Sequence, residues 1–499
     1  MKKIIAFALS IVLLLGVLPL SASAETVDWE ETVIEGLLDV KDSINLSSYN
    51  VTSSQLFDLL NNIYYHYPEI DYYFDWVTDI DFKKSNSNYI SSFEVSYSYS
   101  KATIRQMQSQ IAEALSPAFN AVQKDWDDTE IALYFHDWLC VNFMYDLRLW
   151  SQPGNENHDM YGFLMDSTGV CQSYALTYMY MLRQFDIDSY YVISDEDNHA
   201  WNIVEIDNKW YHVDVTHDDP LVAYQGDDGE IYYAPLDYVG KARYDYFLCS
   251  DAEIDNGKHD NWYNPIGEKV ECGKYTGNDS FKDADSPVAY LNGAWYYLDY
   301  EKQGLFRTYD FKNVTKIATM PEYWEMDGYA YVGYFSNVVA YNGRIFYTDS
   351  THVYSYDVDT SSVNHIASLT DLSDGRYIGF LMEGKDFAFI LGHEIGQDSY
   401  VVDYYTLCQG GHNYVGDWQI VGNQKVKICD LCGDTVESVQ YQKPGDVDGN
   451  GTVNASDLAY LKLFLAGNGI KLGDAADYNG DGEVNATDLA FLKLHLAGA

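Results

Sequence analysis

The pattern of hydrophobic and polar residues changes several times along the chain, and each change marks a different kind of domain. Up to about residue 265, apolar residues at helical spacing alternate with short strand-like runs. From about residue 284 to residue 407, aromatic and polar residues alternate around Asn-Gly pairs, as they do in β-hairpins. Two short helical patterns end the chain. A sequence of 499 residues is too long for one core, so the pattern predicts a multidomain protein.

The first 24 residues predict a signal peptide. Lys2 and Lys3 precede an apolar run from Ile4 to Leu20, and Ala22-Ser23-Ala24 has the form of a cleavage site. We expect the mature chain to begin near Glu25 and to be secreted. Since no later apolar run has transmembrane length, we expect no transmembrane segment in the mature chain.

Residues 25–125 predict an α+β N-terminal region that carries no visible chemistry. Helical patterns are found near Trp29–Leu46, Ser53–Tyr65 and Ile104–Val122, and a strand pair ends at Ile90–Tyr99. We expect this region to pack on the domain that follows it.

Residues 126–265 contain a candidate nucleophile. Gly169-Val170-Cys171 leads into a helical pattern, so Cys171 is predicted to lie at a helix N-terminus. There the helix dipole and the unpaired backbone N–H groups favour a negative charge, which promotes the thiolate form of a cysteine. A buried structural cysteine is the alternative interpretation.

Two strand-like runs after this helix bring a histidine and an aspartate together. The runs are His199–Ile206 and Lys209–Val215, joined by Asp207-Asn208. A two-residue turn pairs Ile206 with Lys209 and makes His199 and Asp214 diagonal neighbours on one face. Asp214 can then hold one tautomer of His199 while His199 takes the proton of the Cys171 thiol. His212 shares the face of Asp214 and is the alternative base.

These residues resemble the transglutaminase-like superfamily of papain-like cysteine peptidases and acyltransferases. The resemblance extends over about Ile131 to Trp262 and is carried by the following motifs: Ala132-Leu133-Tyr134-Phe135-His136-Asp137-Trp138-Leu139, Tyr161-Gly162, Val170-Cys171, His199-Ala200-Trp201-Asn202 and Trp210-Tyr211-His212-Val213-Asp214-Val215-Thr216. It implies an α+β catalytic domain at 126–265, with Cys171 as nucleophile, His199 as general base and acid, and Asp214 as the residue that orients His199. Ser173 departs from the family pattern, in which a glycine is expected.

Stabilisation of an oxyanion requires hydrogen-bond donors beside the nucleophile. We expect the backbone N–H groups of Cys171 and Gln172 to serve in this way, with Tyr161 as a further candidate.

Residues 284–407 predict a β-rich accessory domain built from loose repeats. Tyr290–Tyr297 is echoed by Ala340–Tyr347 and faintly by Met382–Phe389, at a spacing typical of propeller blades. Three blades would not close a ring, and both substrate binding and simple packing are compatible with the pattern.

The seven cysteines include three near the C-terminus whose spacing is typical of a metal site. Within 408–436, Cys408 and His412 are followed by Cys429-x2-Cys432, which would give a tetrahedral Zn²⁺ four ligands. A disulfide or free thiols are the alternatives. Cys249 and Cys272 could form a disulfide in an exported protein.

The end of the chain contains two copies of a calcium-binding loop, 31 residues apart. Oxygen ligands are expected at loop positions 1, 3, 5, 7 and 12, and Gly451 and Gly482 allow the sharp turn at position 6. The expected ligands are Asp446, Asp448, Asn450, Thr452 and Asp457 in the first loop, and Asp477, Asn479, Asp481, Glu483 and Asp488 in the second.

Residues 445–499 resemble a type I dockerin, a small all-α domain. The resemblance implies two Ca²⁺ ions, docking onto a cohesin domain of a scaffolding protein, and an extracellular, cellulosome-associated chain held at the cell surface through the scaffold. It implies cohesin contacts at Ala455, Ser456, Lys462, Ala486, Thr487 and Lys493.

The formal net charge of −46 makes nucleic acid and anionic membranes poor partners. The sequence therefore predicts a secreted cysteine enzyme, a peptidase or a transglutaminase-like acyltransferase, that acts on protein or peptide substrates without a catalytic cofactor. An inactive binding module displayed on the cellulosome and an amine-transferring transglutaminase are the alternatives.

Overall fold

The computed structural model describes most of the chain, in two compact units. One unit runs to Leu381 and includes Ala388–Asp403, and the other consists of Met382–Phe387 and Tyr404–Ala499. The described residues are 28–75, 80–86, 88–151, 153–225, 231–237, 242–255, 257–267, 269–320, 324–326, 329–331, 337–348, 352–368, 376–392, 400–408, 411–412, 418–421, 424–441 and 443–498. The expected signal peptide lies outside them.

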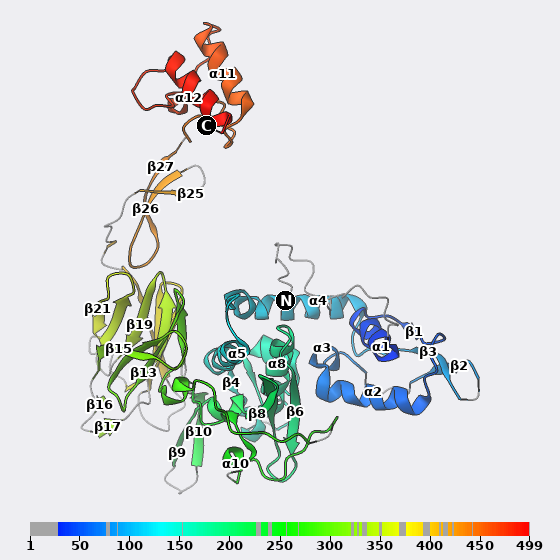
Figure 1. Cartoon of the computed structure of the whole chain (residues 1–499). Helices are drawn as coiled ribbons and strands as arrows, with labels where there is room; N and C mark the ends of the chain where they lie inside the picture. The colour runs from blue at the N-terminus through cyan, green and yellow to red at the C-terminus, as the bar shows by residue number, and fades with distance from the viewer. Residues whose placement is uncertain are drawn as a thin grey trace. The chain divides into compact units, whose positions relative to one another are not determined.

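The N-terminal region forms its own hydrophobic core from helices and a small sheet (Figure 1). Its elements are α1 (Trp29–Leu38), β1 (Ser43–Asn45), α2 (Ser53–His66), α3 (Pro68–Asp71), β2 (Phe82–Lys84), β3 (Ile90–Glu94) and α4 (Lys101–Ala121), with strand order β1-β3-β2. The prediction of one helix up to Leu46 was wrong. The helix ends at Leu38 because Val40 takes a left-handed conformation with φ 52°, and the chain then turns into β1.

The next domain places helices against an antiparallel sheet (Figure 1). The sheet has the strand order β11-β8-β7-β6 and is covered by α8, which also packs against α5. The helices are α5 (Asp128–Asn142), α6 (Arg148–Ser151), α7 (Met160–Asp166), α8 (Cys171–Arg183), α9 (Val215–Asp218) and α10 (Asp251–Ile254). The strands are β4 (Met144–Tyr145), β5 (Thr168–Gly169), β6 (Ser189–Ser194), β7 (His199–Ile206), β8 (Lys209–Val213), β9 (Leu221–Gln225), β10 (Ile231–Asp237) and β11 (Phe247–Cys249).

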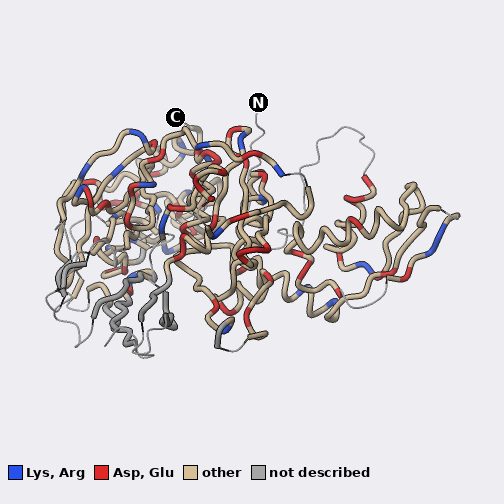
Figure 2. The backbone as a smooth tube through the Cα atoms, turned by 90° about the horizontal axis from the view of Figure 1, so that it is seen from below, with Lys and Arg blue, Asp and Glu red and all other residues tan. Residues whose placement is uncertain are grey.

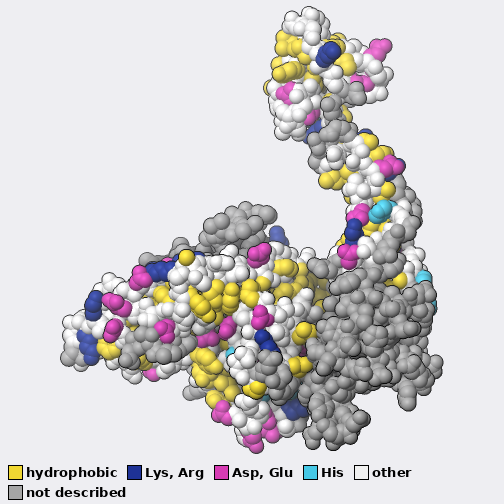
Figure 3. All heavy atoms as spheres, turned by 180° about the vertical axis from the view of Figure 1, so that it is seen from behind, with side chains coloured by type: hydrophobic (Ala, Val, Ile, Leu, Met, Phe, Trp, Pro, Cys, Tyr) yellow, Lys and Arg dark blue, Asp and Glu magenta, His cyan; other side chains and the backbone are white. Residues whose placement is uncertain are grey.

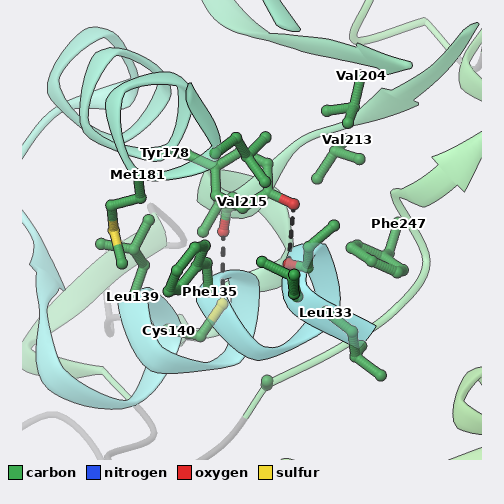
Figure 4. Close-up of a cluster of buried hydrophobic side chains, with 14 of the residues drawn as sticks. Leu133, Phe135, Leu139, Cys140, Tyr178, Met181, Val204, Val213, Val215 and Phe247 are labelled. Carbon is green, nitrogen blue, oxygen red and sulfur yellow. Dashed lines mark hydrogen bonds between the residues drawn. The ribbon is translucent and has the colours of Figure 1, made fainter. Parts of the chain in front are cut away.

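The core of this domain lies between α5, α8 and the sheet (Figure 4). Buried side chains from all three meet there, among them Phe135, Tyr178 and Val213. The Tyr178 hydroxyl donates to the backbone oxygen of Ala132 at 2.9 Å, and so joins the two helices. This packing fixes the position of the first residue of α8 relative to the first residue of β7.

A buried charge cluster joins α5 to α9. His136 Nδ1 lies 2.9 Å from Asp137, and His136 Nε2 lies 3.1 Å from Asp218. Burial opposes a positive charge on His136, but the two carboxylates outweigh it and raise the pKa of His136 to about 9. His136 is therefore a structural cation.

The β-rich region contains two four-stranded antiparallel sheets and smaller ones. The strands are β12 (Ala289–Leu291), β13 (Ala294–Asp299), β14 (Gly304–Thr308), β15 (Val314–Thr319), β16 (Trp324–Met326), β17 (Tyr329–Tyr331), β18 (Val338–Tyr341), β19 (Arg344–Thr348), β20 (His352–Asp357), β21 (Ser362–Ser368), β22 (Arg376–Glu383), β23 (Asp386–Gly392) and β24 (Tyr400–Thr406). The hairpins expected at the Asn-Gly pairs are present. Asn292-Gly293 and Asn342-Gly343 have positive φ at both residues, which a type I′ turn requires.

The first of these sheets shares a core with the domain before it. Trp295 on β13 donates from Nε1 to Glu130 of α5 at 2.8 Å, and its ring packs among the buried side chains of that domain. The Val288 N–H donates to Asp137 at 2.7 Å. The hydrophobic core therefore continues across the domain boundary that was expected between residues 265 and 284.

The second unit contains a small sheet and a helical module. The sheet is formed by β25 (Gln419–Val421), β26 (Gln424–Ile428) and β27 (Thr435–Gln440). The module contains α11 (Ala455–Leu465), a short 3₁₀ helix (Asp474–Ala476) and α12 (Ala486–Leu496). Its core is small, with Val447, Leu461, Ala476 and Leu492 buried.

Acidic residues are spread over the described chain and outnumber basic ones along the backbone (Figure 2). Among the described residues, no helix combines the length and the hydrophobicity that crossing a membrane requires.

Replacement of His136 is expected to destabilise the core. His136→Ala leaves the buried Asp218 carboxylate without its cation, which costs about 3 kcal/mol or more. Folding raises the pKa of His136 from about 6.5, so its contribution is complete below pH 6.5 and is lost as pH rises through about 9. Calorimetry of the full chain measures the loss. His158→Ala is the control, since this exposed histidine pairs with Glu156 at the surface and its loss should change stability by less than about 0.5 kcal/mol.

Candidate functional site

Cys171 is the first residue of α8, as its sequence context predicts. The turn before it is tight. Gly169 lies so close to Ser173 and Phe163 that a Cβ atom there would collide with the Ser173 hydroxyl and lie 2.6 Å from the Phe163 ring. Ser173, where the family pattern has glycine, is fully buried and donates to the backbone oxygen of Val170 at 2.8 Å. The absent side chain of Gly169 makes room for Ser173.

The hairpin that follows has the expected register. Ile206 pairs with Lys209, and the turn residues Asp207 and Asn208 have φ of 52° and 61°, as a type I′ turn requires. The register puts His199 at the start of β7 beside Asp214, which directly follows β8. His199 Nε2 lies 2.7 Å from Asp214 Oδ2, and both side chains are buried.

His199 also interacts with the half-buried Cys171. Burial opposes a charge on His199, but the Asp214 carboxylate and the Cys171 sulfur outweigh it and raise the pKa of His199 to about 10. Burial likewise opposes the charge of Asp214, yet His199 and His217 hold the pKa of that carboxyl well below its ordinary range. The structure thus brings the three candidate catalytic side chains together, with Asp214 ionised.

Two further histidines, which sequence reasoning missed, reach the same carboxylate. His217 Nδ1 lies 2.6 Å and His259 Nε2 lies 2.7 Å from Asp214 Oδ2. His217 is brought there because Asp214 caps α9 and accepts the His217 N–H at 3.2 Å. The three-residue spacing from Asp214 was the available sequence signal for His217. His259 lies on a loop and had no such signal.

His212, the alternative base, lies outside this cluster. Its Nδ1 accepts from Trp201 Nε1 at 3.0 Å, and its Nε2 lies 3.1 Å from Asp251. Burial lowers the pKa of His212 to about 4. Trp201 in turn stacks on His199, with ring centroids 5.4 Å apart, so His212 supports the ring that packs on His199.

The two oxyanion candidates differ in their placement. Gln172 adjoins Cys171, and its side-chain Nε2 donates to the hydroxyl of Tyr64 on α2 at 2.9 Å. The Tyr161 hydroxyl instead donates to Gln110 on α4 at 3.0 Å, and its ring stacks on Tyr72. The structure does not bring the Tyr161 hydroxyl to Cys171, His199 and Asp214.

The four residues of the expected zinc site converge in the second unit. The ligand atoms of Cys408, His412, Cys429 and Cys432 all lie within 4.8 Å of one another. Cys408 and Cys429 have sulfur atoms 3.5 Å apart, near the roughly 3.7 Å expected for two thiolates on one tetrahedral Zn²⁺. Burial opposes ionisation of Cys429, but backbone N–H groups lower its pKa to about 6. The site fits Zn²⁺.

Cys249 and Cys272 are free thiols, so the expected disulfide between them was wrong.

The two calcium loops have matching backbone geometry. The Gly451 N–H donates to Asp446 at 2.9 Å, and the Gly482 N–H donates to Asp477 at 2.7 Å. Both glycines have φ near 90°, in the left-handed region. Asp446 Oδ1 is buried and has no hydrogen-bond partner, as expected of an oxygen that awaits a cation. The remaining expected ligands, Asp448, Asn450, Thr452, Asp457, Asn479, Asp481, Glu483 and Asp488, lie in the same two loops.

Most of the expected cohesin contacts lie at the surface of the helical module. Ala455, Lys462, Ala486, Thr487 and Lys493 are exposed, whereas Ser456 is half-buried and donates to Asp448 at 2.6 Å. Hydrophobic side chains are also exposed on this module (Figure 3). They include Tyr460 and Leu463 on α11 and their repeats Phe491 and Leu494 on α12.

Comparison with protein families identifies two domains. The transglutaminase-like superfamily matches residues 116–215, and the dockerin type I domain matches residues 444–497. The chain therefore contains a transglutaminase-like core domain and a C-terminal type I dockerin domain, separated by a β-rich region. A comparison with curated proteins gave no match.

Solved structures give further, distant similarity. One is the crystal structure of a TGase, with 15% identity over 35% of this chain and 50% of that chain and a TM-score of 0.21. Another is a candidate cysteine protease from Cytophaga hutchinsonii, with 16% identity over 28% of this chain and 61% of that chain and a TM-score of 0.17. The chain thus spans between half and two thirds of the length of either structure.

Adding a methyl group at Gly169 is expected to disturb the nucleophile. Gly169→Ala forces the start of α8 away from Ser173 and Phe163, which costs about 1–3 kcal/mol and slows iodoacetamide labelling of Cys171. In the double variant Gly169→Ala/Ser173→Gly, the contact with Ser173 disappears and part of the loss should return. Gly273→Ala is the control for stability, since a Cβ there meets nothing within 4 Å and the residue does not have a positive φ. Labelling that is unchanged in Gly169→Ala would contradict this account.

Proposed function

We propose that the transglutaminase-like core is a cysteine acyl-transfer enzyme that acts on protein or peptide carbonyl groups and is anchored outside the cell by its dockerin. The observation that carries the proposal is the buried contact of His199 with Asp214 at 2.7 Å, beside the thiol at the start of α8. A nucleophile, a base and a group that orients the base are the three parts that acyl transfer requires.

The chemistry divides into two steps. The proton of the Cys171 thiol passes to Nδ1 of His199, the ring nitrogen that Asp214 leaves free, and the raised pKa of His199 favours this transfer. The Cys171 sulfur then attacks the substrate carbonyl. His199 returns this proton to the departing amine, and a thioester remains on Cys171. Water or a second amine then attacks the thioester, gives its proton to His199 and releases the sulfur, which takes the proton back. Water makes the reaction a hydrolysis, and an amine makes it a transamidation. We favour hydrolysis.

Backbone and neighbouring groups complete the site. The N–H groups of Cys171 and Gln172 at the start of α8 are the proposed oxyanion donors. Tyr65 of α2 and Tyr191 of β6 pack in the cluster that Cys171 contacts, with ring centroids 6.0 Å apart. The N-terminal region therefore supplies part of the wall around the nucleophile, where it can contact the acyl side of a peptide substrate.

The dockerin supplies the anchor. Its small core would gain stability from the two Ca²⁺ ions held by the loops, and the duplicated exposed residues of α11 and α12 offer two similar faces to a cohesin domain. The Cys3His cluster would hold one structural Zn²⁺, because all four of its positions are filled by protein ligands.

Removal of the Cys171 sulfur is expected to abolish activity. Cys171→Ala should lower the rate of peptide cleavage or amine incorporation by at least about 1,000-fold, since the thioester forms on the Cys171 sulfur. A peptide library assayed with and without an added primary amine distinguishes the two reactions. The matched control is Cys249→Ala, because burial raises the pKa of the Cys249 thiol to about 12 and makes it unreactive. Full activity in Cys171→Ala would exclude this mechanism.

Calcium is expected to control docking. Chelation should abolish binding of the full chain to a cohesin domain, and Asp457→Ala or Asp488→Ala should each weaken it by removing the buried ligand at loop position 12. Isothermal titration measures the affinity. Asp434→Ala, a carboxylate outside both loops that pairs with Lys385, is the control. Cohesin binding that persists after chelation would argue against the dockerin as a calcium-dependent anchor.

A further inference from the structure

The side chains around Asp214 have an unusual arrangement for a catalytic triad. Three imidazole nitrogens, from His199, His217 and His259, lie 2.6 to 2.7 Å from the single oxygen Oδ2. A carboxylate oxygen has two lone pairs in its plane, so it cannot accept three well-aligned hydrogen bonds equally. His217 Nδ1 and His199 Nε2 are also only 3.1 Å apart. More donors converge here than the carboxylate needs.

The same four atoms have the composition of a metal site. They are three imidazole nitrogens and one carboxylate oxygen, all within 4.8 Å of one another. Imidazole-rich sets prefer Zn²⁺, Cu²⁺ and Ni²⁺ over Ca²⁺ and Mg²⁺, which take oxygen ligands. The set differs in both chemistry and place from the calcium loops and from the Cys3His cluster.

The ligands come from separate parts of a rigid framework. His199 begins β7, Asp214 caps α9, His217 lies in α9, and His259 lies on the loop before Trp262. Three of the four side chains are at least nine-tenths buried, and His217 keeps 29% of its side chain exposed, which gives an ion a path inwards.

The distances are close to those of an occupied site. Ligand atoms on a tetrahedral ion with bonds of about 2.0–2.1 Å lie roughly 3.3 Å apart. The nitrogens of His199 and His217 are 3.1 Å apart already. The Asp214 oxygen lies 2.6 to 2.7 Å from the three nitrogens and must withdraw by roughly 0.6 Å from each to admit the ion.

We propose that His199, Asp214, His217 and His259 bind one divalent transition-metal ion of the zinc class, and that the bound ion switches the acyl-transfer site off. The second half of this proposal rests on the proposed function. Coordination through Nε2 takes the place of the proton that Nε2 shares with Asp214 and leaves the remaining ring proton on Nδ1. The ring then has no free nitrogen to accept the proton of the Cys171 thiol. Release of the ion returns the proton to Nε2 and restores the base.

Cobalt binding by the full chain tests the site independently of activity. Excess Ca²⁺ keeps the dockerin loops filled, and Cys432→Ser removes a ligand of the Cys3His cluster. We expect this background chain to bind one Co²⁺ whose absorption spectrum lacks a thiolate-to-cobalt band. Addition of His217→Phe should weaken binding at least about tenfold, as expected for loss of a ligand. His158→Phe, at an exposed histidine that pairs with Glu156 on the surface, should leave the affinity unchanged.

Three results would overturn the site: no Co²⁺ on the background chain, an equal affinity after His217→Phe, or a thiolate band that places the ion on Cys171. The switch is tested separately by titrating Zn²⁺ into an acyl-transfer assay. The Zn²⁺ concentration that halves the rate should equal the concentration that half-fills the site. In the His217→Phe chain, with its rate expressed relative to its own rate without Zn²⁺, half-inhibition should require at least about tenfold more Zn²⁺. An active chain that binds Zn²⁺ without inhibition would disprove the switch, whereas an inactive chain that binds Co²⁺ would disprove only the proposed function.

Discussion

The buried carboxylate of Asp214 is the group on which the arrangement of the core depends. An ionised carboxylate without donors is very costly in a protein interior, so its surroundings must supply them. The donors here are the N–H of His217 and the rings of His199, His217 and His259. Because they belong to β7, α9 and the loop before Trp262, satisfying this one charge also fixes three segments relative to each other. Site geometry and local stability therefore have a common cause.

A second polar cluster extends the framework into the β-rich region. Asp137 of α5 contacts His136 and accepts hydrogen bonds from the Tyr244 hydroxyl and the Val288 N–H, each at 2.7 Å. The ring of Trp295 then fills the adjoining hydrophobic core. The first sheet of the β-rich region is thus built into the transglutaminase-like core, which supports the helices that carry Cys171 and the carboxylate cluster.

The C-terminal unit is organised on a different principle. Its helical module buries few hydrophobic side chains, and its sheet of three short strands has exposed apolar residues such as Ile420 and Val421. Small folds of this kind need more than a hydrophobic core. The converging thiols of Cys429 and its neighbours and the unpartnered oxygen of Asp446 offer metal ligands in its place. The stability of the first unit therefore follows from packing, and that of the second is expected to follow from bound ions.

The sequence alone determined those features that depend on local periodicity and turn chemistry. These are Cys171 at the start of a helix, the register set by Asp207-Asn208, the Asn-Gly hairpins and the left-handed glycines of the two repeated loops in the dockerin. Only the tertiary structure decided that His217 and His259 join Asp214, that His212 turns to Trp201, and that Tyr161 binds Gln110. The reason is physical. A strand or turn fixes the direction of its own side chains, whereas a side chain beyond its end is directed by the packing of segments distant in sequence.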